Sequence, residues 1–299
     1  MGRTVESLTS IIDQSDLRYL RCSEADEALV HQAFQDGFSD YMLKMEVSKD
    51  DFIKRFFGPE GNTMEHSFIA FYKQKPVGVI LGGIKNYESI RTMRCGALAI
   101  SPNFRGLGIS QMLFKLHKEE AIKQGCKQLL LEVIVGNDRA INFYTKLGYE
   151  KVYDIVYYSN IELSQLIEKK IWSDVLMKKI SFNECLSFLQ KWNYHINWQN
   201  DVDYLAKAEN IHYYAAYFKD ALAGCISISA NGNISFLMVD KKYRGKGIGS
   251  LLLQTVYREL NVLRMSSGFP NNSLLEGFFK KNGFKKNQLS QYEMYLLLE

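Results

Sequence analysis

The stretch Ala99-Ile100-Ser101-Pro102-Asn103-Phe104-Arg105-Gly106-Leu107-Gly108-Ile109-Ser110 returns later in the chain as Met238-Val239-Asp240-Lys241-Lys242-Tyr243-Arg244-Gly245-Lys246-Gly247-Ile248-Gly249. Each copy is followed by an amphipathic run and then by a second matching stretch, Asn137–Tyr149 in the first half and Asn272–Phe284 in the second. The two pairs of stretches have nearly the same separation along the chain. A repeat with so long a period predicts two domains of one fold rather than a solenoid.

An Arg-x-x-Gly-x-small loop between a strand and a helix is typical of a phosphate site. Its successive backbone N–H groups, with the unpaired donors of the first helical turn, form an anion site that suits a pyrophosphate. Glycines let the backbone approach the ligand and adopt conformations that a Cβ forbids. A single glycine-rich junction is equally compatible with a plain strand–helix turn. The repetition of the loop, in the same order of elements, favours the ligand site.

Composition indicates a globular chain without bulk affinity for nucleic acid. The 299 residues are 46% apolar and 23% charged, which fits about two domains. Residues 1–162 hold 20 Lys and Arg against 21 Asp and Glu, and residues 163–299 hold 17 against 12. Part of this second excess surrounds the second glycine loop, which suits a small polyanion. No apolar run approaches the roughly 18 residues of a membrane helix, so we expect neither a nucleic-acid nor a membrane partner.

The cysteines and histidines indicate no metal and no disulfide framework. The five cysteines are scattered without a C-x-x-C pair, and the five histidines show no ligand spacing. The N-terminus lacks a secretion signal. We therefore expect reduced thiols and a cytoplasmic protein, with an oligomer possible.

Periodicity and turn signals predict the same order of elements in both halves. In the first half, strands are expected at 17–21, 66–72, 76–84, 92–100, 129–135 and 149–159, and helices at 24–34, 49–57, 106–123 and 138–147. Ser48 is the expected cap of the helix at 49–57. The second half repeats this order more tersely. We expect one domain over 1–162, a connector at 163–172, and a second domain over 173–299.

The loop follows a strand ending Leu98-Ala99-Ile100, and an Asn-x-x-Ala-x-x-Phe-Tyr-x-x-x-Gly-aromatic run begins further on, at Asn137. This combination, present twice, resembles the GNAT superfamily of N-acetyltransferases over nearly the whole chain. The resemblance implies an α/β (α+β) fold of two tandem acyltransferase domains. Each would be a mixed, mostly antiparallel sheet flanked by helices. The implied cofactor is acetyl-coenzyme A, and the implied partner is a small-molecule or peptide amine.

The resemblance also implies where the cofactor lies. The strand at 98–100 would part from the strand at 129–135, with the pantetheine arm in the gap and the pyrophosphate on backbone amides of the loop. Asn137 would hold the pantetheine, and Tyr144 would point at the sulfur. The expected cofactor-binding residues are Leu98, Ala99, Ile100, Arg105, Gly106, Leu107, Gly108, Ile109, Ser110, Gln111, Asn137, Tyr144, Val239, Arg244, Gly245, Gly247, Ile248 and Gly249.

Acetyl transfer requires a base that takes a proton from the acceptor amine and an acid that protonates the leaving thiolate. Alkyl ammonium groups titrate near ~10, so the acceptor must lose a proton, and Glu132 is a candidate base, directly or through water. The leaving thiolate needs a donor, which Tyr144 can be. The alternatives are that Glu132 lies on a solvated strand face and that Tyr144 is a core residue. Asn137 can cap a helix as well as contact the cofactor.

The second half lacks both proton-transfer candidates. When the second matching stretches are aligned, Glu132 falls on Ser267 and Tyr144 on Phe279, whereas the second loop has more lysines. We therefore predict an active first domain and a second domain able to bind coenzyme A. Two alternatives remain: an active second domain with the first as scaffold, or a non-catalytic acyl-coenzyme A-binding regulatory module. The acceptor stays open among a small amine, an antibiotic, an amino acid and a protein N-terminus.

Overall fold

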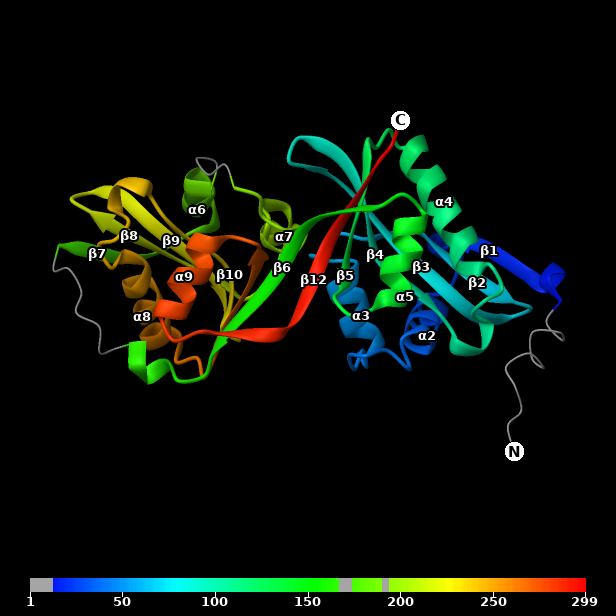
Figure 1. The fold of residues 1–299 in the computed structure, drawn as a ribbon, viewed down its shortest axis with the longest axis horizontal. Coiled ribbons are helices and arrows are strands. Elements are labelled where there is room, and N and C mark those ends of the chain that lie inside the picture. The colour runs from blue at the N-terminus through cyan, green and yellow to red at the C-terminus, as the bar shows by residue number, and fades with distance from the viewer. Residues whose placement is uncertain (1–12, 167–173, 190–193) are drawn as a thin grey trace. The chain divides into compact units, whose positions relative to one another are not determined.

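The computed structural model describes residues 13–166, 174–189 and 194–299. These residues form two compact units that are not consecutive in sequence. The first unit takes in the chain up to Glu132 together with Phe143–Glu150 and Met294–Glu299, and the second takes in Val133–Asn142 and Lys151–Glu293. Figure 1 labels the elements of both units.

The sheet of the first unit confirms the predicted mixed, mostly antiparallel arrangement. Its strands are β1 (Leu17–Arg21), β2 (Thr63–Tyr72), β3 (Lys75–Tyr87), β4 (Ile90–Ile100) and β5 (Gln128–Ile134). The first four pair antiparallel in chain order, and β4 pairs parallel with β5. The end of the chain also belongs to this unit, where the Leu298 N–H donates to the Lys127 carbonyl at 2.8 Å.

Helices cover both faces of this sheet. They are α2 (Glu27–Gly37), α3 (Lys49–Phe56), α4 (Ile109–Lys123) and the second half of α5 (Asp138–Lys146), whose first half falls in the second unit. On one face, Phe34 of α2 and Phe52 of α3 form a core with Ala99 of β4. The neighbouring Ile100 points to the opposite face, which α4 covers. Its side chain and that of Ile109 of α4 both lie over Gly78, where a Cβ would contact them. The predicted cap Ser48 begins α3, but α2 begins three residues later than expected because Asp26 caps it.

The second unit repeats this arrangement. Its strands run in the order β12, β6, β11, β10, β9, β8 and β7, with bounds β6 (Glu150–Asn160), β7 (Val175–Ile180), β8 (Ile211–Phe218), β9 (Ala221–Ser229), β10 (Asn233–Val239), β11 (Met265–Pro270) and β12 (Lys285–Leu297). Strand β10 pairs parallel with β11, whereas β7 to β10 pair antiparallel in turn and β11 pairs antiparallel with β6. The helices are α6 (Phe182–Leu189), α7 (Val202–Lys207), α8 (Ile248–Leu260) and α9 (Ser273–Lys281).

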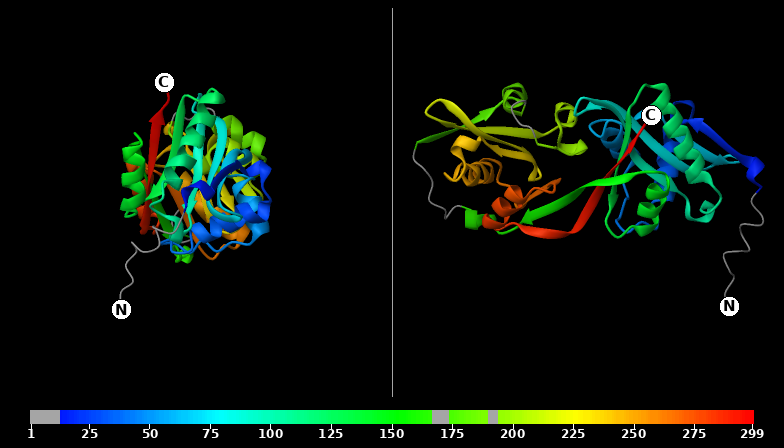
Figure 2. Two further views of the ribbon diagram at one scale, coloured as in Figure 1. Left: turned by 90° about the vertical axis from the view of Figure 1, so that its right-hand side faces the viewer. Right: turned by 45° about the horizontal axis from the view of Figure 1, so that its top comes forward.

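Each unit contains a segment that the sequence order would assign to the other. Most of β6, which the sequence suggests as the last strand of the first domain, belongs to the second unit, where it pairs antiparallel with β11 and lies beside β12 (Figure 2). The last residues of the chain belong to the first unit. The expected connector 163–172 lies mostly outside the described residues. Its described part includes Leu163 and Leu166, which are buried in the core of the second unit.

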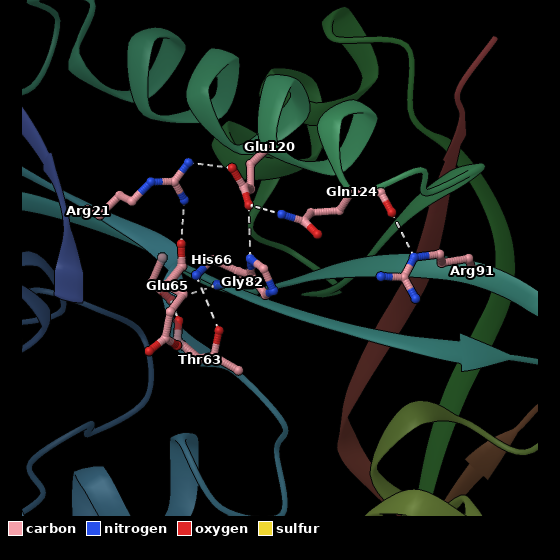
Figure 3. A network of polar contacts seen from close by, with 9 residues as sticks. Arg21, Thr63, Glu65, His66, Gly82, Arg91, Glu120 and Gln124 are labelled. Atoms are coloured by element: carbon pink, nitrogen blue, oxygen red, sulfur yellow. Dashed lines mark hydrogen bonds and ion pairs between the residues drawn. The ribbon is translucent and has the colours of Figure 1, made fainter.

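A polar network ties α4 to the sheet of the first unit (Figure 3). The Glu120 carboxylate accepts hydrogen bonds from Arg21 at 2.5 Å and from Gln124 at 2.8 Å, and it lies 3.0 Å from His66 Nδ1. Although burial opposes it, hydrogen bonds from these groups lower the pKa of Glu120 to about 2. One turn earlier on α4, His117 is fully buried, and neither of its ring nitrogens has a hydrogen-bond partner among the described residues.

We predict that His117 makes the first unit less stable in mild acid. Burial, with a smaller opposing contribution from Glu120 and a reinforcing one from His66, lowers the pKa of His117 to about 3. The unfolded chain, with a pKa near ~6.5, then binds a proton that the folded chain excludes. Stability is therefore lost as the pH falls below about 6.5, by up to about 1.4 kcal/mol per pH unit. Urea unfolding between pH 7.5 and 5 measures this slope.

His117→Val is the matched variant, because alignment of the two loops makes Val256 its counterpart, and Val256 is also fully buried. The difference in unfolding free energy between this variant and the unchanged protein should grow in favour of the variant as the pH falls. Parallel curves for the two proteins would contradict the assignment. Both proteins should still lose stability as the pH falls from about 4.5 towards 2, because there the unfolded chain protonates Glu120 while the folded chain keeps it charged.

Candidate functional site

The first glycine loop presents its backbone rather than its side chains. Gly106 and Gly108 adopt left-handed conformations with φ of 80° and 79°. Gly108 is the N-cap of α4 and supplies no side chain to the first-turn N–H groups. Those donors therefore remain available for an anion. The arrangement can accept a phosphate group, and its use for the diphosphate of coenzyme A stays a prediction.

The side chain of Arg105 fixes this loop in place. Its Nε donates to the Ile100 carbonyl at 3.0 Å, and its Nη atoms contact both carboxylate oxygens of Asp40 at 2.5 and 2.7 Å. A further bond at 3.1 Å reaches the carbonyl of Gly37 at the end of α2. The guanidinium is thus engaged by the protein. A phosphate contact by Arg105 stays a prediction, and its observed contacts position the loop.

The strands β4 and β5 part beside this loop. Their pairing covers Thr92–Arg94 and Gln128–Leu130, although β4 continues to Ile100 and β5 to Ile134 within the described chain. The register of β4 against β3 shifts at the same level, so that Gly96 is an extra residue. A Cβ on Gly96 would lie 2.2 Å from the Asn62 side chain, so this position needs glycine. Such a gap exposes backbone for an extended ligand.

A buried ion cluster spans the point where the strands part. Arg94 Nε donates to Glu132 at 2.7 Å, and its Nη1 donates to Glu60 at 2.9 Å. All three side chains are at most 5% exposed. Glu132 therefore does not lie on a solvated strand face, and β4 supplies it with an ionic partner that lies far from it in sequence. The sequence also leaves Arg94 and Glu60 unidentified.

Tyr144 is buried beside a second tyrosine. It is 8% exposed, and its ring packs edge-on against that of Tyr149, with ring centroids 5.6 Å apart. Burial, and then Cys95, the residue after Arg94 on β4, and Tyr149 raise the pKa of Tyr144 well above 10. Tyr41, in the segment after α2, adds a smaller contribution of the same sign to this pKa. Comparison of the two halves is the sequence signal for Cys95 and Tyr149, since their counterparts are Ile234 and Phe284.

The second glycine loop borders a cavity of about 300 Å³. Gly245 and Gly247 again have positive φ, and Gly247 caps α8 without a side chain. Basic and amide groups line the cavity, among them Arg244, Lys281 and Asn272. The ring of Phe278 packs directly on the backbone of Gly249, where a Cβ would lie 2.7 Å from it. The cavity thus joins anion donors to an apolar wall.

Arg244 repeats the anchoring role of Arg105. Its Nε donates to the Val239 carbonyl at 3.1 Å, as Arg105 does to Ile100. The strands part here too, because the β10–β11 pairing covers only Asn233–Ile234 and Ser266–Ser267 in this described region. A register shift at Ser235 matches that at Gly96. The backbone framework of the site is therefore present in both units.

The side chains of the second unit lack the chemistry of the first. Phe279 is 1% exposed and packs among Tyr158, Phe269 and Phe284. Ser267 is buried and donates to the Ile234 carbonyl at 3.0 Å. Strand pairing aligns Ser266 with Asn233 as Leu130 aligns with Arg94, so Gly268 stands at the level of Glu132. Neither Ser267 nor Gly268 can act as a carboxylate base.

Asn137 is a helix cap, and so is its counterpart. The Asn137 Oδ1 accepts from the Ala140 N–H at 3.2 Å, and the Asn272 Oδ1 accepts from Leu274 and Leu275. Asn137 falls in the second unit, unlike the other residues expected around the first loop. Cofactor contact by Asn137 stays a prediction. The remaining expected residues, Leu98 to Gln111 and Val239 to Gly249, follow the ends of β4 and β10 into the loops.

Comparison with known families decides what this framework is. Residues 27–149 match the profile of the acetyltransferase (GNAT) family, and residues 209–286 match that of an acetyltransferase (GNAT) domain. The chain belongs to the GNAT acetyltransferase family. Its two matched segments coincide with the two copies of the loop and of the parted strands.

Individual relatives agree with this membership. The chain is 28% identical to N-alpha-acetyltransferase 30 of Dictyostelium discoideum over 29% of its own length and 48% of the relative's. It is 34% identical to an acetyltransferase of Pectobacterium atrosepticum over 25% of its length and 51% of the relative's. The chain thus spans about half the length of these curated relatives.

Solved structures show the tandem fold. A tandem GNAT protein from the clavulanic acid biosynthesis pathway aligns with a TM-score of 0.69 at 14% identity, over 94% of this chain and 98% of that one. A GCN5-related N-acetyltransferase from Sphaerobacter thermophilus aligns with a TM-score of 0.64 at 11% identity, over 94% and 96%. Within the described residues, no helix is long and apolar enough to cross a membrane, and no three His, Cys, Asp or Glu side chains gather as a metal site.

Proposed function

We propose that this protein transfers an acetyl group from acetyl-coenzyme A to an amine, with the chemistry in the first unit. The observation that carries the proposal is the contrast between Tyr144 and Phe279 on the same backbone framework. When bound, acetyl-coenzyme A supplies the activated thioester. The first glycine loop would hold its diphosphate, and the gap between β4 and β5 would hold its pantetheine arm.

The acid of the reaction is Tyr144. Its side chain is shielded from solvent. Burial disfavours the phenolate, so Tyr144 is fully protonated near neutral pH and ready to donate.

The base of the reaction is Glu132 or a water molecule that it orients. Its side chain lies at the first residues of β5 that no longer pair with β4. The carboxylate is already engaged by Arg94 at 2.7 Å, so a water between Glu132 and the amine is the favoured route for the proton. The acceptor class would be identified by thiol release in a screen of amines, including peptide N-termini and amino sugars.

Tyr144→Phe tests the acid. Without the hydroxyl the thiolate must leave unprotonated, so kcat should fall roughly 10²–10⁴-fold while the affinity for acetyl-coenzyme A changes little. Thiol release under saturating substrates measures kcat, and calorimetry measures the affinity. Turnover close to that of the unchanged protein would move the chemistry to the second unit.

Glu132→Gln tests the base, with Glu60→Gln as the matched control. Both substitutions remove one carboxylate from Arg94, but only Glu132 lies on the strand beside the gap. The acidic limb of kcat/KM against pH should disappear in Glu132→Gln and remain in Glu60→Gln. Equal losses in the two variants would indicate that Glu132 acts only through the ion cluster.

We infer further that the second unit binds coenzyme A without catalysing its transfer. The cavity beside Gly247 joins free helix N–H donors to Arg244 and Lys281, and contacts between basic side chains and phosphate are charge-assisted. Its acid position is occupied by the buried Phe279. This makes the second unit a coenzyme A-binding module that lacks the proton donor of the first.

Gly247→Glu tests this second site. The new carboxylate would enter the space of the diphosphate. The stoichiometry of coenzyme A binding, measured by calorimetry, should therefore fall from two sites to one. Gly108→Glu, the matched change in the first loop, should also leave one site and should abolish turnover. A stoichiometry of one that survives Gly247→Glu would mean that the second cavity takes no coenzyme A. Thermal unfolding of each variant verifies that both units remain folded.

A further inference from the structure

Tyr149 carries a buried hydroxyl that packing does not explain. The side chain is 2% exposed, and the hydroxyl oxygen has no hydrogen-bond partner among the described residues. A buried polar group without a partner destabilises a fold. The second unit has Phe284 at this position, 3% exposed, so a phenyl ring fills the place well. The hydroxyl of Tyr149 therefore has another use.

The position of Tyr149 points to that use. Its ring packs edge-on against Tyr144, with ring centroids 5.6 Å apart, and lies 5.9 Å from Phe114 of α4. Burial, and then the nearby thiol of Cys95, raise its pKa well above 10. Cys95 follows the last residue of β4 that pairs with β5. The two phenols thus lie against each other, and the thiol of Cys95, where the gap opens, contributes to the raised pKa of both.

The hydroxyl of Tyr149 has no hydrogen-bond partner in the part of the chain that the structure describes, although its ring packs against that of Tyr144. A ligand sulfur atom placed beside Tyr144 would provide Tyr149 with an acceptor. Hydrogen bonds to an ionised acceptor are about twice as strong as neutral ones, so a thiolate gains most from a second donor.

We propose that Tyr149 is a second hydrogen-bond donor to the sulfur of coenzyme A, acting beside Tyr144. The inference rests on the proposed acetyl transfer in the first unit. The amine nitrogen forms a bond to the acetyl carbon and gives up a proton towards Glu132 through water. As the carbon–sulfur bond of the thioester breaks, its electron pair goes to sulfur, and the proton of the Tyr144 hydroxyl moves to that sulfur. Tyr149 keeps its own proton and stabilises the negative charge by its hydrogen bond.

Binding tests this contact without any turnover. Calorimetry compares coenzyme A with desulfo-coenzyme A, which lacks the sulfur, in protein carrying Gly247→Glu so that the first unit alone is titrated. Tyr149→Phe should weaken the binding of coenzyme A roughly 3–10-fold at pH 9, where its thiol, with a pKa near ~8.5, is largely ionised. The loss of affinity should be smaller at pH 7, where the thiol is protonated. Desulfo-coenzyme A should bind equally to both proteins. Tyr87→Phe, which changes another buried tyrosine of the first unit, should leave the affinity for both ligands unchanged.

Kinetics separate this inference from the proposed function. Tyr149→Phe should lower kcat roughly tenfold with KM for acetyl-coenzyme A nearly unchanged. The loss should be smaller in a Tyr144→Phe background, because both groups act on one sulfur. Full turnover in Tyr144→Phe would reject the proposed function. A different result would reject only the role of Tyr149: Tyr144→Phe loses turnover, whereas Tyr149→Phe keeps its kcat and still binds coenzyme A more tightly than desulfo-coenzyme A.

Discussion

The parting of β4 from β5 is the constraint on which the site depends. Parallel pairing ends at Arg94 and Leu130, and the extra residue Gly96 turns the rest of β4 away. The separated strands leave backbone groups that a ligand can pair with, and they also bring Arg94 against Glu132 and Cys95 against Tyr144. One local irregularity in the sheet thus creates both the binding gap and the polar surroundings of the proposed chemistry.

The second unit shows that this framework does not require that chemistry. It keeps the register shift, the early end of parallel pairing, the left-handed glycines and the arginine that anchors the loop. Its side chains at the acid position and at the following aromatic are Phe279 and Phe284, which share one apolar core. Backbone geometry is therefore maintained by glycines and strand pairing, while side chains around the gap are free to differ.

The parts of the fold that the sequence predicts are those set by local rules. The glycine loops, the Ser48 cap and the alternation of strands depend on residues that are neighbours in the chain. The engagement of Arg105 by Asp40 and of Arg94 by Glu60 depends on residues 65 and 34 positions away, which no local pattern links. The exchange of β6 and the chain end between units also depends on long-range pairing. For Glu132 the strand was predictable, but its ionic partners were not.

The differences between the units also indicate that the first unit holds buried polar groups at a cost in stability. Replacing a buried ion pair by well-packed apolar groups is often neutral or stabilising. The first unit nevertheless holds the buried Arg94 cluster and the unpaired hydroxyl of Tyr149, where the second has Asn233 and Phe284. Groups that destabilise a fold persist where function needs them, since activity and stability trade against one another. The placement of these groups at one gap, and their replacement at the other, is the physical reason to place proton transfer in the first unit.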